Sequence, residues 1–310
     1  MVNNNSVVIV GGGTMGCDIA GLFYASGWNA QVVDTNDHVR AKLPAQVLAS
    51  AETAGIHRSH GSVTVLDSLQ AIDWTEVRLV IECVLEELTL KQQVFQELES
   101  LAPATVPLAS NSSGFPISQI SENCNTRTRM LGLHFFMPAH LVPAVEVVRS
   151  AQSDESVAQE VSEIMRSVRK KPVQVKRDVP GFLANRIQHA MMREAIALVN
   201  EGFASAEDVD LAVRYGFGFR YIAAGPLLQK DLAGIDIHCA AAASIYPHLN
   251  NDTEPSPLMQ RLVAEGSYGV KSLKRKGFYD WDEQSIERAE RRYQVALKKA
   301  MQILIDEDET

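Results

Sequence analysis

Three stretches of this 310-residue sequence end in side chains that can bind or transfer protons, and each follows an apolar run typical of a buried strand. They are Glu82, the polar cluster at 110–113 and His134. A further carboxylate, Glu146, lies inside an apolar run, where burial requires a partner. A lone histidine is more often structural than catalytic. A Glu146–His134 pair, however, would fix the imidazole tautomer and raise its basicity. His134 is therefore a candidate base for a hydroxyl proton.

A glycine-rich loop near the start of the chain predicts a phosphate-binding turn. Gly11, Gly13 and Gly16 follow a β-branched run at 6–10 and open a helix expected from Thr14 to about Ser26. The first glycine permits a sharp turn, the second lets backbone approach a pyrophosphate, and the third lets the helix pack closely on the sheet. The helix N-terminus would direct free N–H groups at the phosphates. An ordinary strand–turn–helix corner is the alternative interpretation.

An aspartate indicates which dinucleotide this loop binds. A second short strand, expected at 30–33, ends in Asp34, at about the distance expected for the acid that bonds a ribose 2′-OH. A carboxylate here would repel a 2′-phosphate, and residues 35–38 contain no arginine to accept one. The sequence therefore predicts NAD rather than NADP as the cofactor.

Length, charge and cysteine usage exclude several other classes of protein. The chain is long enough for two domains, and its net charge of -9 without a basic stripe argues against a nucleic-acid partner. No apolar run reaches membrane-spanning length, and no basic region typical of a signal peptide precedes the first strand. The four cysteines lack metal or redox spacing, which predicts a reduced, cytoplasmic protein without a metal site: Cys17, Cys83, Cys124 and Cys239.

The expected elements that position these residues divide the chain in two. Strands and helices alternate up to about residue 180, which predicts an α/β domain with a Rossmann-type doubly wound sheet at 1–180. Within it, the helix expected at 37–54 should break or kink at Pro44. The composition changes at Pro180–Gly181, and a smaller all-helical domain is predicted over 181–310. Its expected helices lie at 182–200, 205–215, 227–248 and 285–305.

Over nearly its whole length, the sequence resembles the 3-hydroxyacyl-CoA dehydrogenase superfamily. The motifs that carry the resemblance are Gly11–Gly16, Ile81–Glu86, Ser110–Ser113, Leu133–Phe136, Val145–Val148, Asp178–Phe182 with Asn185–Arg186, and Lys276–Trp281. The resemblance implies an NAD-dependent oxidoreductase of fatty acid metabolism, which pairs as a homodimer through its helical domain.

The resemblance also implies roles for individual residues. His134 would be the general base and Glu146 its partner, while Ser113 and Asn185 would bind the reacting oxygen of the substrate. A serine hydroxyl and an asparagine amide can both donate to an oxygen that gains negative charge. The positions implied to contact the cofactor, besides the glycines and Asp34, are Thr14, Met15, Glu82, Glu87 and Lys271. Structural alternatives are a turn for Ser113, a helix cap for Asn185, a solvated strand end for Glu82 and a solvated basic run for Lys271.

Departures from the family pattern concern the substrate. Met137 replaces the usual asparagine after His-Phe-Phe, and the stretch at 39–60 is shorter than the family insert that clasps coenzyme A. That stretch holds few cations: Arg40, Lys42 and Arg58. The segment at 216–226 resembles members that act on free acids, such as gulonate, carnitine and pyridine-carboxylate dehydrogenases. Arg220 could then bind a substrate carboxylate, or else form an ordinary ion pair.

The sequence thus favours an NAD-dependent dehydrogenase that oxidises the β-hydroxyl of an L-3-hydroxyacyl-CoA. A dehydrogenase of a free hydroxy acid or small carboxylated alcohol is a close second hypothesis. A non-catalytic NAD(H)-binding protein, crystallin-like or a sensor, and a lyase or epimerase that retains NAD are alternatives from other classes. The expected partners are a small-molecule substrate and a second copy of the chain, with neither nucleic acid nor membrane.

Overall fold

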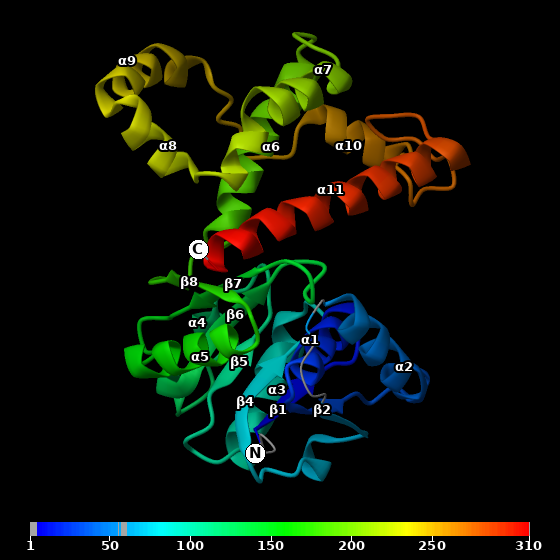
Figure 1. Ribbon diagram of the computed structural model, residues 1–310, viewed down its shortest axis with the longest axis vertical. Helices are drawn as coiled ribbons and strands as arrows, with labels where there is room; N and C mark the ends of the chain where they lie inside the picture. The colour runs from blue at the N-terminus through cyan, green and yellow to red at the C-terminus, as the bar shows by residue number, and fades with distance from the viewer. Residues whose placement is uncertain (1–4, 55, 57–60, 310) are drawn as a thin grey trace. The chain divides into compact units, whose positions relative to one another are not determined.

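The computed structural model describes residues 5–54, 56 and 61–309, and its N-terminal part is built on one eight-stranded sheet (Figure 1). The strand order is β3-β2-β1-β4-β5-β6-β7-β8. The strands are β1 Ser6–Val10, β2 Asn29–Val33, β3 Ser62–Leu66, β4 Val77–Glu82, β5 Leu108–Ser110, β6 Met130–Phe135, β7 Ala144–Val148 and β8 Lys171–Val175. The first six run parallel, which confirms the predicted Rossmann-type sheet.

Helices cover both faces of this sheet, so apolar side chains predominate in its central strands. Along β1, Val7 and Ile9 pack into one core and Val8 and Val10 into the other. The first core receives the helices α1 Thr14–Ala25, α2 Asp37–Thr53 and α5 Glu155–Ser167, and the second receives α3 Leu88–Leu101 and α4 Ile117–Ile120. Helix α2 continues through Pro44, so the break expected there is absent from this described segment.

Two features of the sheet place the candidate site. Strand β1 lies between β2 and β4, so the crossover connections diverge beside it and leave a crevice at the carboxyl ends of the strands. The connection from β6 to β7 is a short loop at 136–143, and β7 therefore returns antiparallel to β6 instead of continuing the parallel pattern. His134 pairs directly with Glu146 across this antiparallel ladder.

The chain separates into two compact units, residues 1–186 (unit 1) and 187–310 (unit 2). Helix α6, Ala184–Asn200, begins in unit 1. The described part of unit 2 contains helices but no strand, as predicted. They are α7 Ala206–Leu211, a π-helical turn at 212–217, 3-10 turns at 218–222 and 246–248, α8 Pro226–Ala233, α9 Ile235–Ile245, α10 Pro257–Ala264 and α11 Glu283–Glu309.

Two details of unit 2 differ from the sequence-based expectation. The single helix predicted at 227–248 is two helices, because Gly234 adopts φ +100° between them, a conformation that favours glycine. Helix α10 was not predicted, and Pro257 stands at its first position. Among the helices described, none is both long and apolar enough to cross a membrane.

Candidate active site

The loop between β1 and α1 has the geometry that each of its glycines was predicted to provide. Gly11 has φ +103°, and a Cβ there would lie 2.7 Å from the carbonyl oxygen of Cys83. A Cβ on Gly16 would lie 1.9 Å from the Gly11 carbonyl oxygen, so only glycine fits. A Cβ on Gly13 would meet nothing within 4 Å. The open backbone at Gly13, beside the exposed Thr14 and half-buried Met15, therefore fits an approaching pyrophosphate.

Asp34 lies directly beside this loop. Its Oδ2 accepts the Gly12 N–H at 2.8 Å, and its Oδ1 accepts the Asn36 N–H at 2.8 Å. Arg40 donates to the backbone carbonyl of Asp34 at 2.8 Å and pairs with the carboxylate of Asp37. The Arg40 guanidinium is thus already bonded within the protein, while the Asp34 carboxylate faces the loop. This arrangement fits a ribose with free hydroxyls, as in NAD.

His134 and Glu146 form a buried pair at the carboxyl end of β6. The Nδ1 atom of His134 lies 2.7 Å from Glu146 Oε2, and the two residues are 3% and 1% exposed. The other oxygen, Oε1, accepts the N–H groups of Leu183 and Ala184 at 3.0 and 2.9 Å. Burial by itself would raise the pKa of Glu146, but these contacts with His134, Ala184 and Leu183 lower it below the ordinary value.

The ionised carboxylate decides which imidazole nitrogen can act as a base. Because Glu146 is an acceptor, the proton of a neutral His134 lies on Nδ1, and Nε2 carries the free lone pair. Two aromatic rings hold the imidazole, with ring centroids 4.7 Å away for Phe136 and 5.5 Å away for Phe182. Phe182 is 1% exposed and has φ 47°, which is rare for a bulky residue. Tertiary packing therefore fixes the orientation of the histidine.

A buried ion pair joins Glu82, at the end of β4, to Lys91 of α3. The carboxylate of Glu82 accepts Lys91 Nζ at 2.8 Å, the Val84 N–H at 2.7 Å and the Ser110 hydroxyl at 2.6 Å. Glu82 and Lys91 are 0% and 1% exposed. Glu82 is therefore not a solvated strand end, and its two oxygens are held by internal donors. Its predicted contact with the cofactor remains a prediction.

Glu86, which is not among the predicted site residues, bonds to the serine-rich loop after β5. Its Oε1 accepts the Ser112 hydroxyl at 2.6 Å, the Gly114 N–H at 3.0 Å and the Ser113 N–H at 3.2 Å. Its Oε2 lies 3.3 Å from Lys91 Nζ. Burial opposes ionisation, yet Ser112, Gly114 and Lys91 lower the pKa of Glu86 below its ordinary value. No signal in the sequence distinguishes Glu86 from its neighbour Glu87.

The remaining predicted residues fall at four places in the structure. Ser113 is exposed on the loop after β5, and Asn185 is half-buried in the first turn of α6. Glu146 accepts the N–H groups just before Asn185, so helix capping does not account for the asparagine. Glu87 is exposed immediately before α3. Lys271 is exposed in unit 2, in the segment between α10 and α11.

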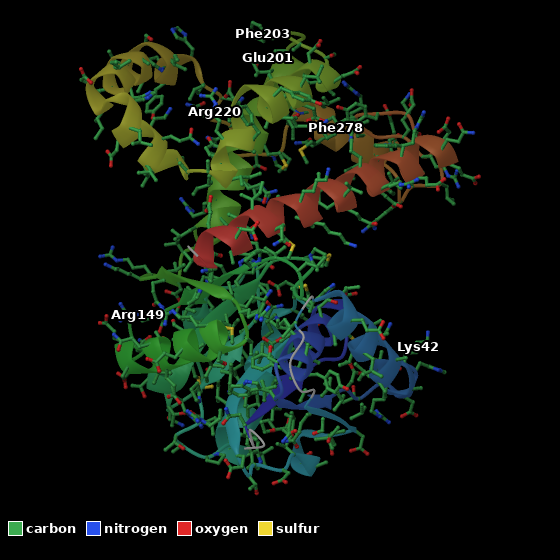
Figure 2. The ribbon with its side chains drawn as sticks, viewed as in Figure 1. Lys42, Arg149, Glu201, Phe203, Arg220 and Phe278 are labelled. Carbon is green, nitrogen blue, oxygen red and sulfur yellow. The ribbon has the colours of Figure 1, made fainter. Side chains whose placement is uncertain are left out.

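Arg220 is an exposed residue of unit 2 (Figure 2). Its guanidinium donates through Nε and Nη2 to the carbonyl oxygen of Gly216, and it lies 5.9 Å from the Phe219 ring centroid. The carboxylate ion pair that was its structural alternative is not found among the described residues. Its guanidinium therefore keeps N–H donors that no carboxylate of the described residues engages.

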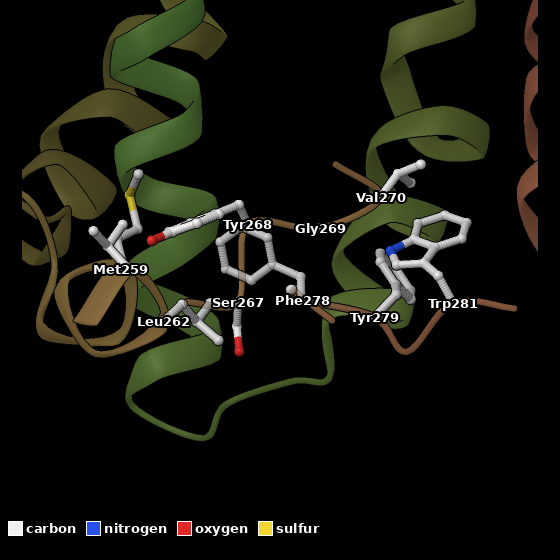
Figure 3. Close-up of a pocket in the computed structure, with 11 residues that line it drawn as sticks. Met259, Leu262, Ser267, Tyr268, Gly269, Val270, Phe278, Tyr279 and Trp281 are labelled. Carbon is white, nitrogen blue, oxygen red and sulfur yellow. The ribbon is translucent and has the colours of Figure 1, made fainter. Parts of the chain in front are cut away.

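Unit 2 also contains an apolar pocket of about 350 Å³ between α10 and the segment that follows it (Figure 3). Its lining residues are Met259, Leu262, Val263, Ser267, Tyr268, Gly269, Val270, Gly277, Phe278, Tyr279 and Trp281. The lining lacks an ionisable acid or base suited to alcohol oxidation, apart from the tyrosines. The described residues elsewhere contain no cluster of His, Cys, Asp and Glu that could hold a metal ion.

The fold and this set of residues define an NAD-dependent oxidoreductase with a Rossmann-type cofactor domain. Comparison with models of protein families then identifies the family of oxidoreductases. The NAD-binding domain of 3-hydroxyacyl-CoA dehydrogenase matches residues 6–179, and the C-terminal domain of the same enzymes matches residues 181–281. The chain therefore belongs to the 3-hydroxyacyl-CoA dehydrogenase family.

Relatives within the family differ in their substrates. The chain is 28% identical to 5-formyl-3-hydroxy-2-methylpyridine 4-carboxylate 5-dehydrogenase of Mesorhizobium japonicum, over 97% of this chain and 99% of that one. A crystal structure of a dehydrogenase for the same pyridine carboxylic acid, described as an NAD+ dependent dismutase, matches with a TM-score of 0.87 and 26% identity over 97% of both chains. The crystal structure of (S)-3-hydroxybutyryl-CoA dehydrogenase from Ralstonia eutropha matches with a TM-score of 0.71 and 28% identity, over 91% of this chain and 100% of that one.

Proposed function

We propose that this protein is an NAD-dependent dehydrogenase that oxidises the hydroxyl of a small molecule carrying its own carboxylate, without coenzyme A. The observation that carries the chemistry is the buried His134–Glu146 pair, which leaves Nε2 of the imidazole as the base. The substrate class rests on the cation-poor surface of α2 and on the likeness to the pyridine-carboxylate dehydrogenase. The sequence alone favoured an L-3-hydroxyacyl-CoA and placed the free acid second, so the order of these two substrate classes is reversed.

In the proposed reaction, His134 Nε2 removes the hydroxyl proton as the carbon loses its hydride. NAD, when its pyrophosphate is bound at the glycine loop, would supply the hydride acceptor through its nicotinamide. Glu146 remains ionised and stabilises the imidazolium that forms, because its pKa is already lowered by its donors. Ser113 and Asn185 would donate to the substrate oxygen. The rings of Phe136 and Phe182 keep the imidazole in one orientation while it gains its proton.

The charge on α2 favours a substrate without coenzyme A. A pantetheine-linked nucleotide carries several phosphate charges, which are best bound by several Lys or Arg side chains. Arg40 is committed to Asp34 and Asp37, and Lys42 is an exposed cation on the same helix (Figure 2). Arg58, the remaining cation of the 39–60 stretch, lies outside the described residues. A small carboxylate could instead be bound by one guanidinium, such as that of Arg220.

An L-3-hydroxyacyl-CoA remains the second candidate, because the C-terminal family model and the butyryl-CoA dehydrogenase likeness both favour it. A panel of substrates distinguishes the two. NADH formation is measured at 340 nm with L-3-hydroxybutyryl-CoA, 3-hydroxybutyrate, gulonate, carnitine and a hydroxymethylpyridine carboxylate. Turnover confined to free acids supports the proposal, and turnover confined to the thioester contradicts it. Arg220→Met should weaken binding of a free acid, whereas Lys42→Met serves as the matched change of an exposed cation.

We also propose that the protein forms a homodimer through unit 2. Every residue of α7 to α10 is described and none is buried. Large apolar side chains on α8 and α9 are exposed, including Leu227 at 82% and Leu232 at 77%. Burying such residues stabilises association. Light scattering should give twice the chain mass, and Leu232→Asp should lower it to one chain. A monomeric wild type would contradict the proposal.

A further inference from the structure

A cluster of buried charged side chains lies behind the loop that joins β6 to β7. Asp18 of α1 is 7% exposed, although it lies in an otherwise apolar stretch of the helix. Its Oδ2 accepts the Ala139 N–H at 3.1 Å, and its Oδ1 accepts the Ser50 hydroxyl at 2.8 Å. The Nδ1 atom of His140 lies 3.0 Å from Oδ1, at an angle outside hydrogen-bond geometry. One carboxylate thus contacts α2 and two consecutive residues of the loop.

Lys170 holds the end of the same loop that leads into β7. It is 3% exposed, and its Nζ donates to the Val142 carbonyl at 2.6 Å. Burial lowers the pKa of Lys170 to about 8, and the nearby charge of Asp18 acts in the opposite direction. Burial also opposes ionisation of Asp18, but the contacts from His140 and Ser50 lower its pKa below the ordinary value. The buried Asp18 carboxylate therefore holds the middle of this short loop, and the buried Lys170 amine holds its end.

This loop carries a side chain that packs against the candidate base. Phe136 contacts the His134 ring with centroids 4.7 Å apart, and Met137 beside it is 65% exposed. The loop also joins the strand of His134 to the strand of Glu146. Burial of a carboxylate at the position of Asp18 costs free energy. Its presence on the buried face of the cofactor-binding helix therefore calls for a specific role.

We infer that Asp18, His140 and Lys170 are positioning residues, which hold the loop at 136–143 against the cofactor-binding helix and thereby set the orientation of the His134 imidazole. None of the three is proposed to touch the substrate. Asp18 lies on the helix that begins at the glycine loop. Its contacts therefore connect that helix to the loop that carries Phe136 and Met137. This inference rests on the proposed role of His134.

The test uses the full-length variants His140→Gln and Asp18→Asn. We expect kcat with the active panel substrate to fall about tenfold, because small displacements of a catalytic group are costly, while NADH affinity measured by fluorescence changes less than about twofold. Amide hydrogen exchange at 137–142 should accelerate about tenfold or more. Ser50→Ala is the matched control, since it removes a donor from the same carboxylate but not from the loop. It should leave kcat and loop exchange within about twofold of wild type.

A readout that needs no activity separates this inference from the proposed function. In protein labelled with ¹⁵N-histidine, the ring signals of His134 are assigned by their loss in His134→Gln. We expect these signals to shift in His140→Gln and Lys170→Met but not in Ser50→Ala. Unchanged His134 signals in both His140→Gln and Lys170→Met would overturn the inference, as would faster loop exchange with unchanged kcat. If the wild type oxidises no panel substrate, the proposed function fails while the nitrogen shifts still decide the role of the cluster.

Discussion

Unit 1 and unit 2 differ in which side chains they bury: unit 1 encloses charged side chains, whereas unit 2 leaves large apolar ones exposed. Unit 1 buries the carboxylates of Glu82 and Glu146 and the ammonium of Lys91, and each is held by named partners. In unit 2, large apolar side chains stand exposed on short helices, among them Ile235 at 64% and Tyr246 at 71%. Unit 1 has a sheet covered on both faces, which provides the enclosed volume in which polar networks can be fixed.

The difference shows where precise geometry can be built. A buried and fully bonded network specifies one arrangement of its members, whereas exposed helices gain their stability only when further apolar surface is covered. The candidate base accordingly belongs to the unit with the closed core. The following predictions test this contrast, beginning with the largest expected effect.

The largest loss of activity is expected for His134→Gln in unit 1. The variant keeps a polar side chain of similar size but has no basic nitrogen, so kcat should fall about 10²–10⁴-fold. NADH binding, measured by fluorescence, should change little because the glycine loop and Asp34 are untouched. Normal turnover in this variant would contradict the proposed mechanism. A parallel loss of NADH binding would show that the pair supports the cofactor site as well.

The largest loss of stability is expected for Lys91→Met. The change leaves Glu82 as an uncompensated buried charge, so the free energy of unfolding should fall by about 3–5 kcal/mol. Chemical denaturation followed through the unit 1 tryptophans, Trp28 and Trp74, measures it. The double variant Glu82→Gln/Lys91→Met should recover much of the loss. Lys42→Met, at an exposed cation, is the control and should change stability by less than about 0.5 kcal/mol.

Acid should destabilise unit 1 through its bonded carboxylates. The pKa values of Glu86 and Glu146 are lowered from the ordinary 4.5, so the unfolded chain binds protons at a higher pH than the folded one. Their contribution is complete above pH 4.5 and is lost as the pH falls through the folded pKa values. Denaturation midpoints measured between pH 3 and 6 should show this loss. Glu146→Gln should flatten the slope, and an unchanged slope would contradict the assignment.

A smaller effect of opposite sign is expected in unit 2 at alkaline pH. Burial and the hydrogen bond to Asp210, 2.8 Å long, raise the pKa of Tyr279 from 10.0 to about 12. Its contribution to stability is therefore present below pH 10 and is lost as the pH rises toward 12. Trp281, whose ring centroid lies 5.8 Å from that of Tyr279, reports this through its fluorescence. In Tyr279→Phe the alkaline change should be smaller.

Much of the cofactor site could be predicted from the sequence because its parts are local. Gly11, Gly13, Gly16 and Asp34 lie within one strand–helix–strand unit, where spacing alone dictates the backbone turn and the position of the acid. The Glu146–His134 contact was also predictable, since a glutamate inside an apolar strand needs a partner. The break between α8 and α9 was missed, because a single glycine inside an apolar helical pattern does not reveal its φ angle.

Only the tertiary structure decided how the carboxylates are used. The sequence could not show that Glu86 rather than Glu87 holds the serine loop, or that Asp18 faces His140 and Ala139, which lie more than a hundred residues further along the chain. Spacing determines backbone conformation over one or two elements. Which buried charge meets which donor depends on the packing of distant elements into one core, where every polar group must find a partner.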